Sequence, residues 1–336
     1  MEAPARILIV NTTRIGDTLA ATPAIDRLHR HWPSAHITVI GSPHRVCMVE
    51  NLPGVERVVP MTKRVARFRG WLQRNAYDLA LVYNYDEPLV RYALRVASRV
   101  VAFRQKSADI NRRLSLCIDP DAYPTVHITE HFLRLPAALG IHGGNGRILY
   151  RCHAQEVEAA AKRLQDQGFL SRRPLVGLQV ASFATKSYRD WPVESFLALS
   201  QAILARWPNA GFLIYGGAVE KPRTLWLKER LAGSALLLAG QLSLRETAAV
   251  MSLSDLYIGV DTGPTHLMSS FDIPIIGLYH PRHPARCLGP KDHPLNFSLD
   301  HPGSDDLDGE PSPMSAIRAD QVFARVEHAL ARRGYV

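Results

Sequence analysis

The strongest constraint on the fold is a repeated alternation of short apolar runs with longer segments of helical periodicity. Two such series follow one another along the chain. Strands that alternate with helices in this way are typical of doubly wound α/β domains, and two series predict two of them. The expected strands are Arg6–Val10, His36–Ile40, Arg57–Val59, Asp78–Tyr83 and Val100–Phe103 in the first series, and Leu175–Val180, Gly211–Tyr215, Ala235–Leu238, Leu256–Val260 and Pro274–Leu278 in the second.

A length of 336 residues agrees with two domains. The second series begins after a helix expected at Gln155–Gln167, so we expect the domains to span residues 1–168 and 169–336. The last helix, Asp320–Arg332, is a candidate to pack back on the first domain. Ligands of open α/β sheets bind at the carboxyl ends of the strands, here expected to face one another across an interdomain cleft.

The composition excludes several classes of protein. No apolar run approaches the roughly 18 residues that a transmembrane helix needs. The first residues lack a basic segment and a cleavage site, which predicts a cytoplasmic protein. The four cysteines form no C-x-x-C pair and H-E-x-x-H is missing, so neither a disulfide framework nor a metal site is expected.

The positive charge is concentrated in one part of the first half. Between Pro60 and Arg113 there are 12 basic and 4 acidic residues, a net charge of +8 out of +9 for the chain. Such a region attracts nucleic acid, an anionic membrane surface or a phosphorylated substrate, and no zinc-finger or RNP-type motif supports nucleic acid. Val65, Phe68 and Leu72 recur at helical spacing among arginines. They predict an amphipathic basic helix, either at a membrane or anionic acceptor or with an ordinary buried stripe.

The segment after the strand Leu256–Val260 is the strongest candidate site. Asp261, Thr262 and Gly263 form a turn, and a proline follows where a helix would begin. Free backbone N–H groups at such a helix start bind phosphate, and His266 in the first turn is a further donor. The alternative is a plain capped helix with Thr262 as the N-cap.

Polar loops follow three other expected strands. After the first strand, Asp17 is the only carboxylate of its loop, and it is either a general base toward a hydroxyl or, like Thr22, a cap of the next helix. Lys186 and Arg189 are candidates for holding a diphosphate, and Glu220 for accepting hydrogen bonds from ribose. G-x-G-x-x-G and G-x-x-x-x-G-K-[ST] are missing, which disfavours a dinucleotide dehydrogenase and a P-loop ATPase.

These motifs together resemble glycosyltransferase family 9, the ADP-heptose:lipopolysaccharide heptosyltransferases. The resemblance covers essentially the whole chain. It is carried by Arg14-Ile15-Gly16-Asp17 with the T-P-A after it, Trp191-Pro192, Asp261-Thr262-Gly263-Pro264-Thr265-His266-Leu267, Leu278-Tyr279 with Pro281, and Met314–Leu330.

The family implies a GT-B fold, two Rossmann-like domains of which the second holds the nucleotide sugar. It also implies an inverting, metal-independent transfer from ADP-heptose to a hydroxyl of the anionic lipopolysaccharide core, at the cytoplasmic face of the inner membrane and without a cofactor. By position, Asp17 would be the general base. Thr262, Gly263 and His266 would lie at the diphosphate, with Asp261 supporting their turn and Glu220 near the ribose. The acceptor would meet the basic first domain, at Arg64, Arg67 and Arg69.

The sequence departs from the family pattern at two places. Arg189 stands where the family usually has a lysine, and Lys186 precedes it by three residues, so either or both would hold the diphosphate. His280 replaces the glycine of the usual L-Y-G-P. The alternatives are a GT-B transferase or epimerase that uses a different nucleotide sugar, a two-domain binding protein, and a sugar-nucleotide binder without turnover.

Overall fold

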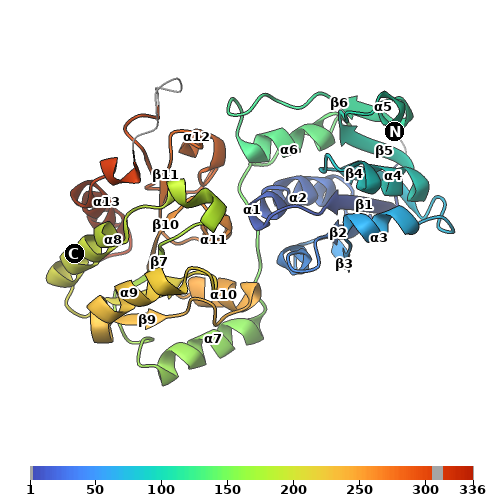
Figure 1. The fold of residues 1–336 in the computed structure, drawn as a ribbon. Coiled ribbons are helices and arrows are strands. Elements are labelled where there is room, and N and C mark those ends of the chain that lie inside the picture. Colours follow the sequence, from blue (N-terminus) through green and yellow to red (C-terminus); the bar gives the residue numbers. More distant parts are fainter. Residues whose placement is uncertain (1–2, 305–312, 336) are drawn as a thin grey trace. The chain divides into compact units, whose positions relative to one another are not determined.

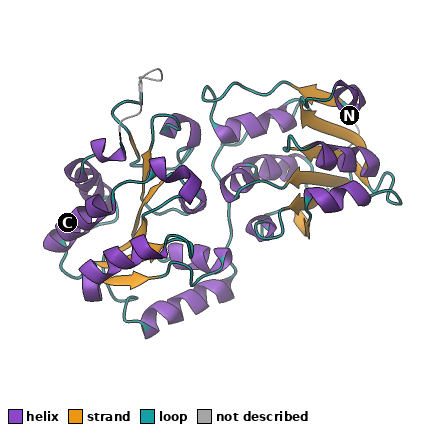
Figure 2. Cartoon of the chain, in the orientation of Figure 1, coloured by secondary structure: helices purple, strands orange, loops and turns teal. Residues whose placement is uncertain are grey.

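The chain consists of two compact α/β units. The computed structural model describes residues 3–304 and 313–335. The units are Met1–Arg151 and Cys152–Val336, and each contains one six-stranded parallel sheet with helices on both faces (Figures 1 and 2). The predicted doubly wound architecture is therefore confirmed. None of the helices in the described ranges is long and apolar enough to cross a membrane.

The sheet of the first unit has the strand order β3-β2-β1-β4-β5-β6. Its five predicted strands form, and a short sixth one was missed. The strands are β1 (Arg6–Asn11), β2 (His36–Gly41), β3 (Val55–Pro60), β4 (Tyr77–Val82), β5 (Ala97–Phe103) and β6 (Leu116–Ile118). The helices are α1 (Ile15–Ala20), α2 (Thr22–His31), α3 (Lys63–Phe68), α4 (Glu87–Val96), α5 (Ala108–Arg113) and α6 (Ile128–Ala137).

Strand β1 lies at the centre of this sheet and is buried on both faces. Ile7 and Ile9 belong to the core that α2 and α6 cover, whereas Leu8 and Val10 belong to the core under α4. Successive side chains of a strand point to opposite faces, so a continuous apolar run fits a strand between two helical layers.

The sheet of the second unit has the order β12-β11-β10-β7-β8-β9. The predicted strands again form, with a short β12 in addition. The strands are β7 (Leu175–Gln179), β8 (Gly211–Tyr215), β9 (Ala235–Leu237), β10 (Leu256–Val260), β11 (Ile275–Tyr279) and β12 (Leu299–Asp300). The helices are α7 (Ala154–Asp166), α8 (Val193–Arg206), α9 (Lys221–Leu231), α10 (Leu244–Met251), α11 (Gly263–Met268), α12 (Ala285–Leu288) and α13 (Ala319–Ala331).

Two helices decide where the second unit begins and ends. Helix α7 packs on α10, and Arg245 of α10 holds Glu156 of α7 through two hydrogen bonds of 2.5 and 2.7 Å. The chain therefore divides at residues 151 and 152, before α7, and not after it at 168 and 169 as the sequence indicated. The last helix, α13, packs on α8 and on β10 and β11 of the same unit.

The basic helix expected around Val65, Phe68 and Leu72 is shorter than its periodicity indicated. Helix α3 ends at Phe68, and of its six residues only Ala66 is buried. Gly70 follows with a φ of +88°, and a Cβ there would lie 2.6 Å from Val96 Cγ1. The prediction of one amphipathic helix is wrong because the chain turns at this glycine, which α4 approaches too closely for a side chain.

Candidate functional site

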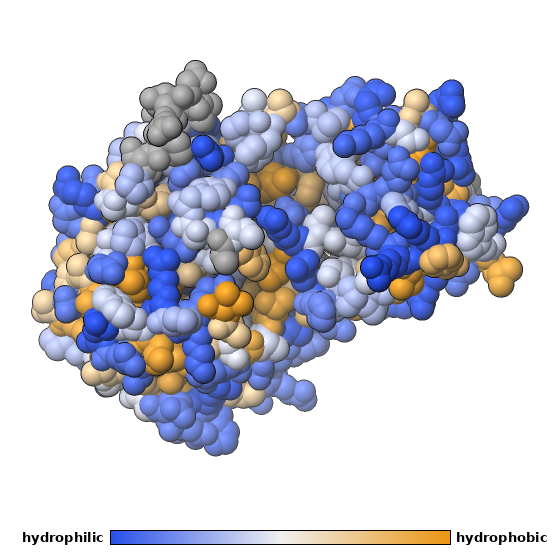
Figure 3. Space-filling model, in the orientation of Figure 1, coloured by the Kyte–Doolittle hydropathy of each residue, from blue (hydrophilic) through white to orange (hydrophobic). Residues whose placement is uncertain are grey.

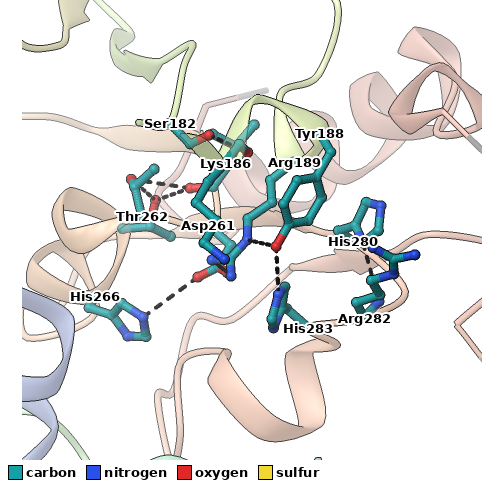
Figure 4. Close-up of polar contacts among 12 residues, drawn as sticks. Ser182, Lys186, Tyr188, Arg189, Asp261, Thr262, His266, His280, Arg282 and His283 are labelled. Atoms are coloured by element: carbon teal, nitrogen blue, oxygen red, sulfur yellow. Dashed lines mark hydrogen bonds and ion pairs between the residues drawn. The ribbon is translucent and has the colours of Figure 1, made fainter. Parts of the chain in front are cut away.

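Both sheets have a point at which the connections to neighbouring strands run in opposite directions. This point lies between β1 and β4 in the first unit and between β7 and β10 in the second. Loops diverge there at the carboxyl ends of the strands and leave room for a ligand. In the second unit the segment after β7 carries Lys186 and Arg189. Asp261 follows β10 directly, and His266 lies on α11 just after it, so the structure brings these predicted residues together (Figure 4).

Asp261 is the centre of this cluster. Its side chain is 3% exposed. Its Oδ2 lies 2.5 Å from Arg189 Nη1, and its Oδ1 lies 3.6 Å from His266 Nε2. Burial alone raises the pKa of this carboxyl, but the hydrogen bond of His266 and the charges of His266, Arg189 and His283 outweigh it and lower the pKa. Asp261 therefore stays ionised at neutral pH and fixes the cations around it.

The turn before α11 does not use its threonine as a cap. Thr262 occupies the N-cap position, yet its hydroxyl donates to the Val260 carbonyl at 3.3 Å and makes no capping bond. The hydroxyl of Thr265 donates to the same carbonyl at 2.6 Å and pairs with the Tyr257 hydroxyl at 3.0 Å. Gly263 opens a helix of only six residues, so few peptide dipoles add up there. The side-chain cations thus supply most of the positive charge.

Lys186 and Arg189 differ in what already binds them. Both lie on a short 3₁₀ helix, Ala184–Arg189, whose backbone is non-helical at Lys186. The guanidinium of Arg189 is held by Asp261, whereas in the described part of the chain no carboxylate lies within ion-pair distance of Lys186. The Lys186 ammonium lies 5.6 Å from the centre of the Tyr188 ring. Lys186 is therefore the cation available to an anionic ligand.

The sequence missed an aromatic group beside these cations. The Tyr188 hydroxyl lies 2.9 Å from His283 Nε2, and the rings of Tyr188 and His280 form a T-shaped pair with 4.9 Å between their centres (Figure 4). Burial first, and nearby positive charges second, lower the pKa of both histidines to about 4. Both are neutral at pH 7. His280 was noticed only as a departure from the family pattern, and Tyr188 and His283 are 95 residues apart in sequence.

A second carboxylate, also missed, holds the loop after β7. Asp190 accepts hydrogen bonds from the Ser182 amide and hydroxyl, both at 2.7 Å, and from Arg223 Nη1 at 2.9 Å. Burial raises its pKa more than these partners lower it. Its only sequence signal was its place next to Arg189. Because Arg223 belongs to α9, this contact fixes the loop on the helix that follows β8.

Glu220 lies where the sequence placed it, at the mouth of β8. It is the residue before α9, and its Oε2 covers the backbone of Gly217, where a Cβ would lie 2.6 Å away. No cation lies within ion-pair distance of Glu220 in residues 3–304 and 313–335. Its carboxylate thus remains an acceptor for a ligand's hydroxyl groups.

The first unit places Asp17 in the first turn of α1, after β1. The capping alternative for this residue is wrong, because Arg14 is the N-cap of α1 and Ala21 that of α2. Asn11 Nδ2 donates to the Asp17 carbonyl at 3.0 Å, and Asn84, which follows β4, accepts from the Thr12 amide at 2.9 Å. These bonds brace the loop at the point between β1 and β4.

The other capping candidate, Thr22, is used elsewhere. Its hydroxyl donates to the Leu19 carbonyl at 2.7 Å and accepts from the Leu149 amide at 2.8 Å.

The three arginines predicted to bind the acceptor are exposed and lie on α3 or directly after it: Arg64, Arg67 and Arg69. Helix α3 follows the edge strand β3, two strands away from β1. Across the described ranges, no three His, Cys, Asp or Glu side chains gather as metal ligands would.

Comparison with known proteins shows which family this chain resembles over most of its length. The sequence model of glycosyltransferase family 9 (heptosyltransferase) matches residues 24–308, a range that begins after the loop of Asp17. Lipopolysaccharide heptosyltransferase 1 of Escherichia coli K12 is 27% identical, over 87% of this chain and 96% of that protein.

Two solved structures share the fold over nearly the whole chain. The family 9 glycosyl transferase of Veillonella parvula has a TM-score of 0.86 and 19% identity, with 99% of both chains covered. Escherichia coli heptosyltransferase WaaC with ADP has a TM-score of 0.73 and 19% identity, with 96% of this chain and 99% of that one covered. The predicted GT-B fold is thus confirmed, and the relatives identify an enzyme that transfers a sugar. The chain belongs to glycosyltransferase family 9, the heptosyltransferase family.

Proposed function

We propose that this enzyme transfers a heptose from ADP-heptose to a hydroxyl of the lipopolysaccharide core, with inversion at the anomeric carbon and without a metal ion. The observation that carries the proposal is the cluster of Lys186, Arg189, Asp261 and His266 at the ligand-binding end of the second sheet. Support for the donor comes from the WaaC structure with ADP, and support for the acceptor from the lipopolysaccharide heptosyltransferase of E. coli.

In this proposal the second unit binds the donor. Lys186 is the main ligand of the diphosphate because no carboxylate in residues 3–304 and 313–335 is paired with its charge. Arg189, the amides of Thr262 and Gly263, and His266 complete the phosphate site, and Asp261 holds Arg189 and His266 in place. Glu220 accepts hydrogen bonds from the ribose hydroxyls. These fixed donors stabilise the negative charge that develops on the departing diphosphate.

The first unit supplies the base and binds the acceptor. The Asp17 carboxylate takes the proton of the acceptor hydroxyl while that oxygen bonds to the anomeric carbon. The bond from that carbon to the diphosphate oxygen breaks on the opposite face, and ADP leaves with the electron pair. Proton transfer to a positioned base is worth about 10²–10⁴-fold in rate. Arg64, Arg67 and Arg69 bind the anionic acceptor, and the enzyme works at the cytoplasmic face of the inner membrane.

Donor choice and metal dependence are tested by ligand-induced stabilisation. ADP, UDP, GDP and ADP-heptose are each added with magnesium and with a chelator, and the melting temperature is recorded. A ligand at 100 times its Kd adds about 2.7 kcal/mol of stability, which is easily measured. Stabilisation by ADP and ADP-heptose that survives the chelator is expected. A preference for UDP or GDP would overturn the donor, and a strict need for metal would overturn the metal-free mechanism.

The role of Asp17 is tested with Asp17→Asn, and the matched control is Asp26→Asn, which removes a carboxylate of the same unit that is paired with Arg30. We expect Asp17→Asn to lower turnover by about 10²–10⁴-fold and to leave ADP affinity unchanged. Asp26→Asn should change neither. Loss of ADP affinity in Asp17→Asn would argue against its role as a base, and NMR of the product anomer decides between inversion and retention.

A further inference from the structure

The last residue of α3 and the four residues after it present three large apolar side chains to solvent. Phe68 is 81% exposed, Trp71 64% and Leu72 100%. Single apolar side chains are common on protein surfaces, but a contiguous group of them marks a site that binds another apolar surface. All three also border one groove, which is lined as well by Ile40 of β2, Val59 of β3 and Met61, the residue after β3. We call Phe68–Leu72 the apolar loop.

The apolar loop is held in place by its neighbours. Arg95 of α4 donates to the Ala66 carbonyl, and its Nη2 donates to the Arg69 carbonyl at 2.9 Å. The same guanidinium lies 4.8 Å from the centre of the Trp71 ring. Gly70 is buried against α4. The backbone of the loop is thus anchored on the side of α4, while its large side chains are left in solvent.

Positive charge surrounds the apolar loop. Residues 61–75 contain five basic side chains and no acidic one. Lys63 forms an ion pair with Asp86 at 2.6 Å. The remaining four have no carboxylate partner among the residues that the structure describes: Arg64, Arg67, Arg69 and Arg74. In Figure 3, orange apolar residues protrude among blue ones at the end of the first unit that carries α3.

We propose that the apolar loop inserts into the surface of an anionic lipid bilayer while these four arginines bind its headgroups. Apolar burial together with attraction to anionic lipid is what holds interfacial segments on membranes, and tryptophan favours the headgroup level. A single-stranded nucleic acid would stack on Phe68 and Trp71 but would leave the aliphatic Leu72 uncovered. The choice of a lipid surface rests on the proposed function, because a lipopolysaccharide acceptor is itself a membrane amphiphile.

The test is binding of the full-length enzyme to sedimenting vesicles. Vesicles of equal parts phosphatidylglycerol and phosphatidylcholine are compared with vesicles of phosphatidylcholine alone. We expect binding to the anionic vesicles to fall about tenfold or more in the double variant Phe68→Ser and Leu72→Ser. The triple variant Arg64→Gln, Arg67→Gln and Arg74→Gln should lose about fivefold for each charge removed. Leu225→Ser, at an exposed leucine of α9, is the matched control and should bind like the wild type.

Insertion itself is read from Trp71. Brominated acyl chains should quench part of the tryptophan fluorescence of the wild type, and Trp71→Phe should keep most of the binding but lose that quenching. Failure of the wild type to bind anionic vesicles, or full binding by the Phe68 and Leu72 double variant, would overturn the proposal. So would a single-stranded oligonucleotide that binds more tightly than the vesicles and displaces them.

These outcomes are separate from those of the proposed function. ADP affinity, measured by calorimetry without lipid, should be the same in the double variant and the wild type, since the donor residues lie in the second unit. Loss of vesicle binding with intact ADP binding therefore concerns the apolar loop alone. If the enzyme bound vesicles but failed to bind ADP, the membrane role of the apolar loop would stand and the proposed donor would be wrong.

Discussion

Arg189 Nη1 and Asp261 Oδ2 are 2.5 Å apart, and their side chains are 14% and 3% exposed. The pair joins the loop after β7 to the loop after β10, on either side of the point where the strand order reverses. An arginine that is already bound to a buried carboxylate serves mainly to position that carboxylate and its neighbours. We therefore propose that Lys186, on the same short 3₁₀ helix, binds the charge of the ligand.

The two cations should therefore respond differently to substitution. Lys186→Met should weaken ADP binding about 10- to 100-fold, the worth of a hydrogen bond to a charged group, with little change in stability. Arg189→Met leaves the buried Asp261 without its guanidinium and should cost roughly 3–5 kcal/mol of stability. Calorimetry with ADP and urea unfolding measure the two effects. If Lys186→Met bound ADP as tightly as the wild type and Arg189→Met were as stable as the wild type, the roles assigned to these two cations would be wrong.

Most of the fold could be predicted because central strands of these sheets are buried on both faces and read as continuous apolar runs. Periodicity failed at α3, where Val65, Phe68 and Leu72 have helical spacing but the helix ends at Phe68. What ends it is the close approach of α4 to Gly70, a contact between distant segments that no local pattern records. The domain boundary was misplaced for a similar reason, since the bond from Arg245 to Glu156 assigns α7 to the second unit.

The part of the candidate site that lies within one short segment of the chain could be predicted from the sequence. The turn from Asp261 to His266 follows a strand and opens a helix, and both features are visible in the sequence. The contacts of Tyr188 with His283 and of Asp190 with Arg223 join residues from separate loops and helices. They depend on the strand order of the sheet, and a single sequence does not give that order.

The stability of the enzyme should fall as the pH drops from 6.5 toward 4. His280 and His283 have a pKa of about 4 in the folded chain, against an ordinary value of 6.5. Between these values the unfolded chain binds protons that the folded chain excludes, so acid favours unfolding. Each histidine contributes at most about 1.4 kcal/mol per pH unit. Urea unfolding at several pH values measures the slope.

His280→Asn isolates one of these contributions. In the wild type the Arg282 amide donates to His280 Nδ1 at 3.2 Å. The side-chain oxygen of the asparagine can accept the same hydrogen bond, but the asparagine cannot titrate. The slope between pH 6.5 and 4 should become shallower than in the wild type. His44→Asn, the same substitution at an exposed histidine, is measured beside it as the comparison. Equal slopes in the wild type and His280→Asn would contradict the assignment.

Glu156 should be the residue that attaches α7 to the second unit. Its carboxylate binds Arg245 in two places and accepts the His153 amide at 2.8 Å, which completes a capping box. Glu156→Ala removes a cap and a bidentate ion pair together and should lower the free energy of unfolding by about 1–3 kcal/mol. Glu158, exposed on the same helix, is the control. If Glu158→Ala lowered the free energy of unfolding as much as Glu156→Ala does, the loss would reflect helix propensity and not the ion pair with Arg245.

The face of the second sheet that carries Tyr279 should not tolerate added volume at its glycines. A Cβ on Gly277 would lie 2.5 Å from Tyr279 Cε2 and 2.8 Å from its hydroxyl oxygen, and this ring is only 1% exposed. Gly277→Ala must therefore displace a packed ring and should cost about 1–3 kcal/mol. At Gly233 nothing beyond the adjoining backbone and the neighbouring residues lies within 4 Å of the added carbon, and φ is not in the left-handed region. Gly233→Ala should be neutral or stabilising by up to about 1 kcal/mol, because it restricts the unfolded chain. The melting temperatures of both variants test this prediction. Equal melting temperatures would mean that the Tyr279 ring can move aside without loss of stability.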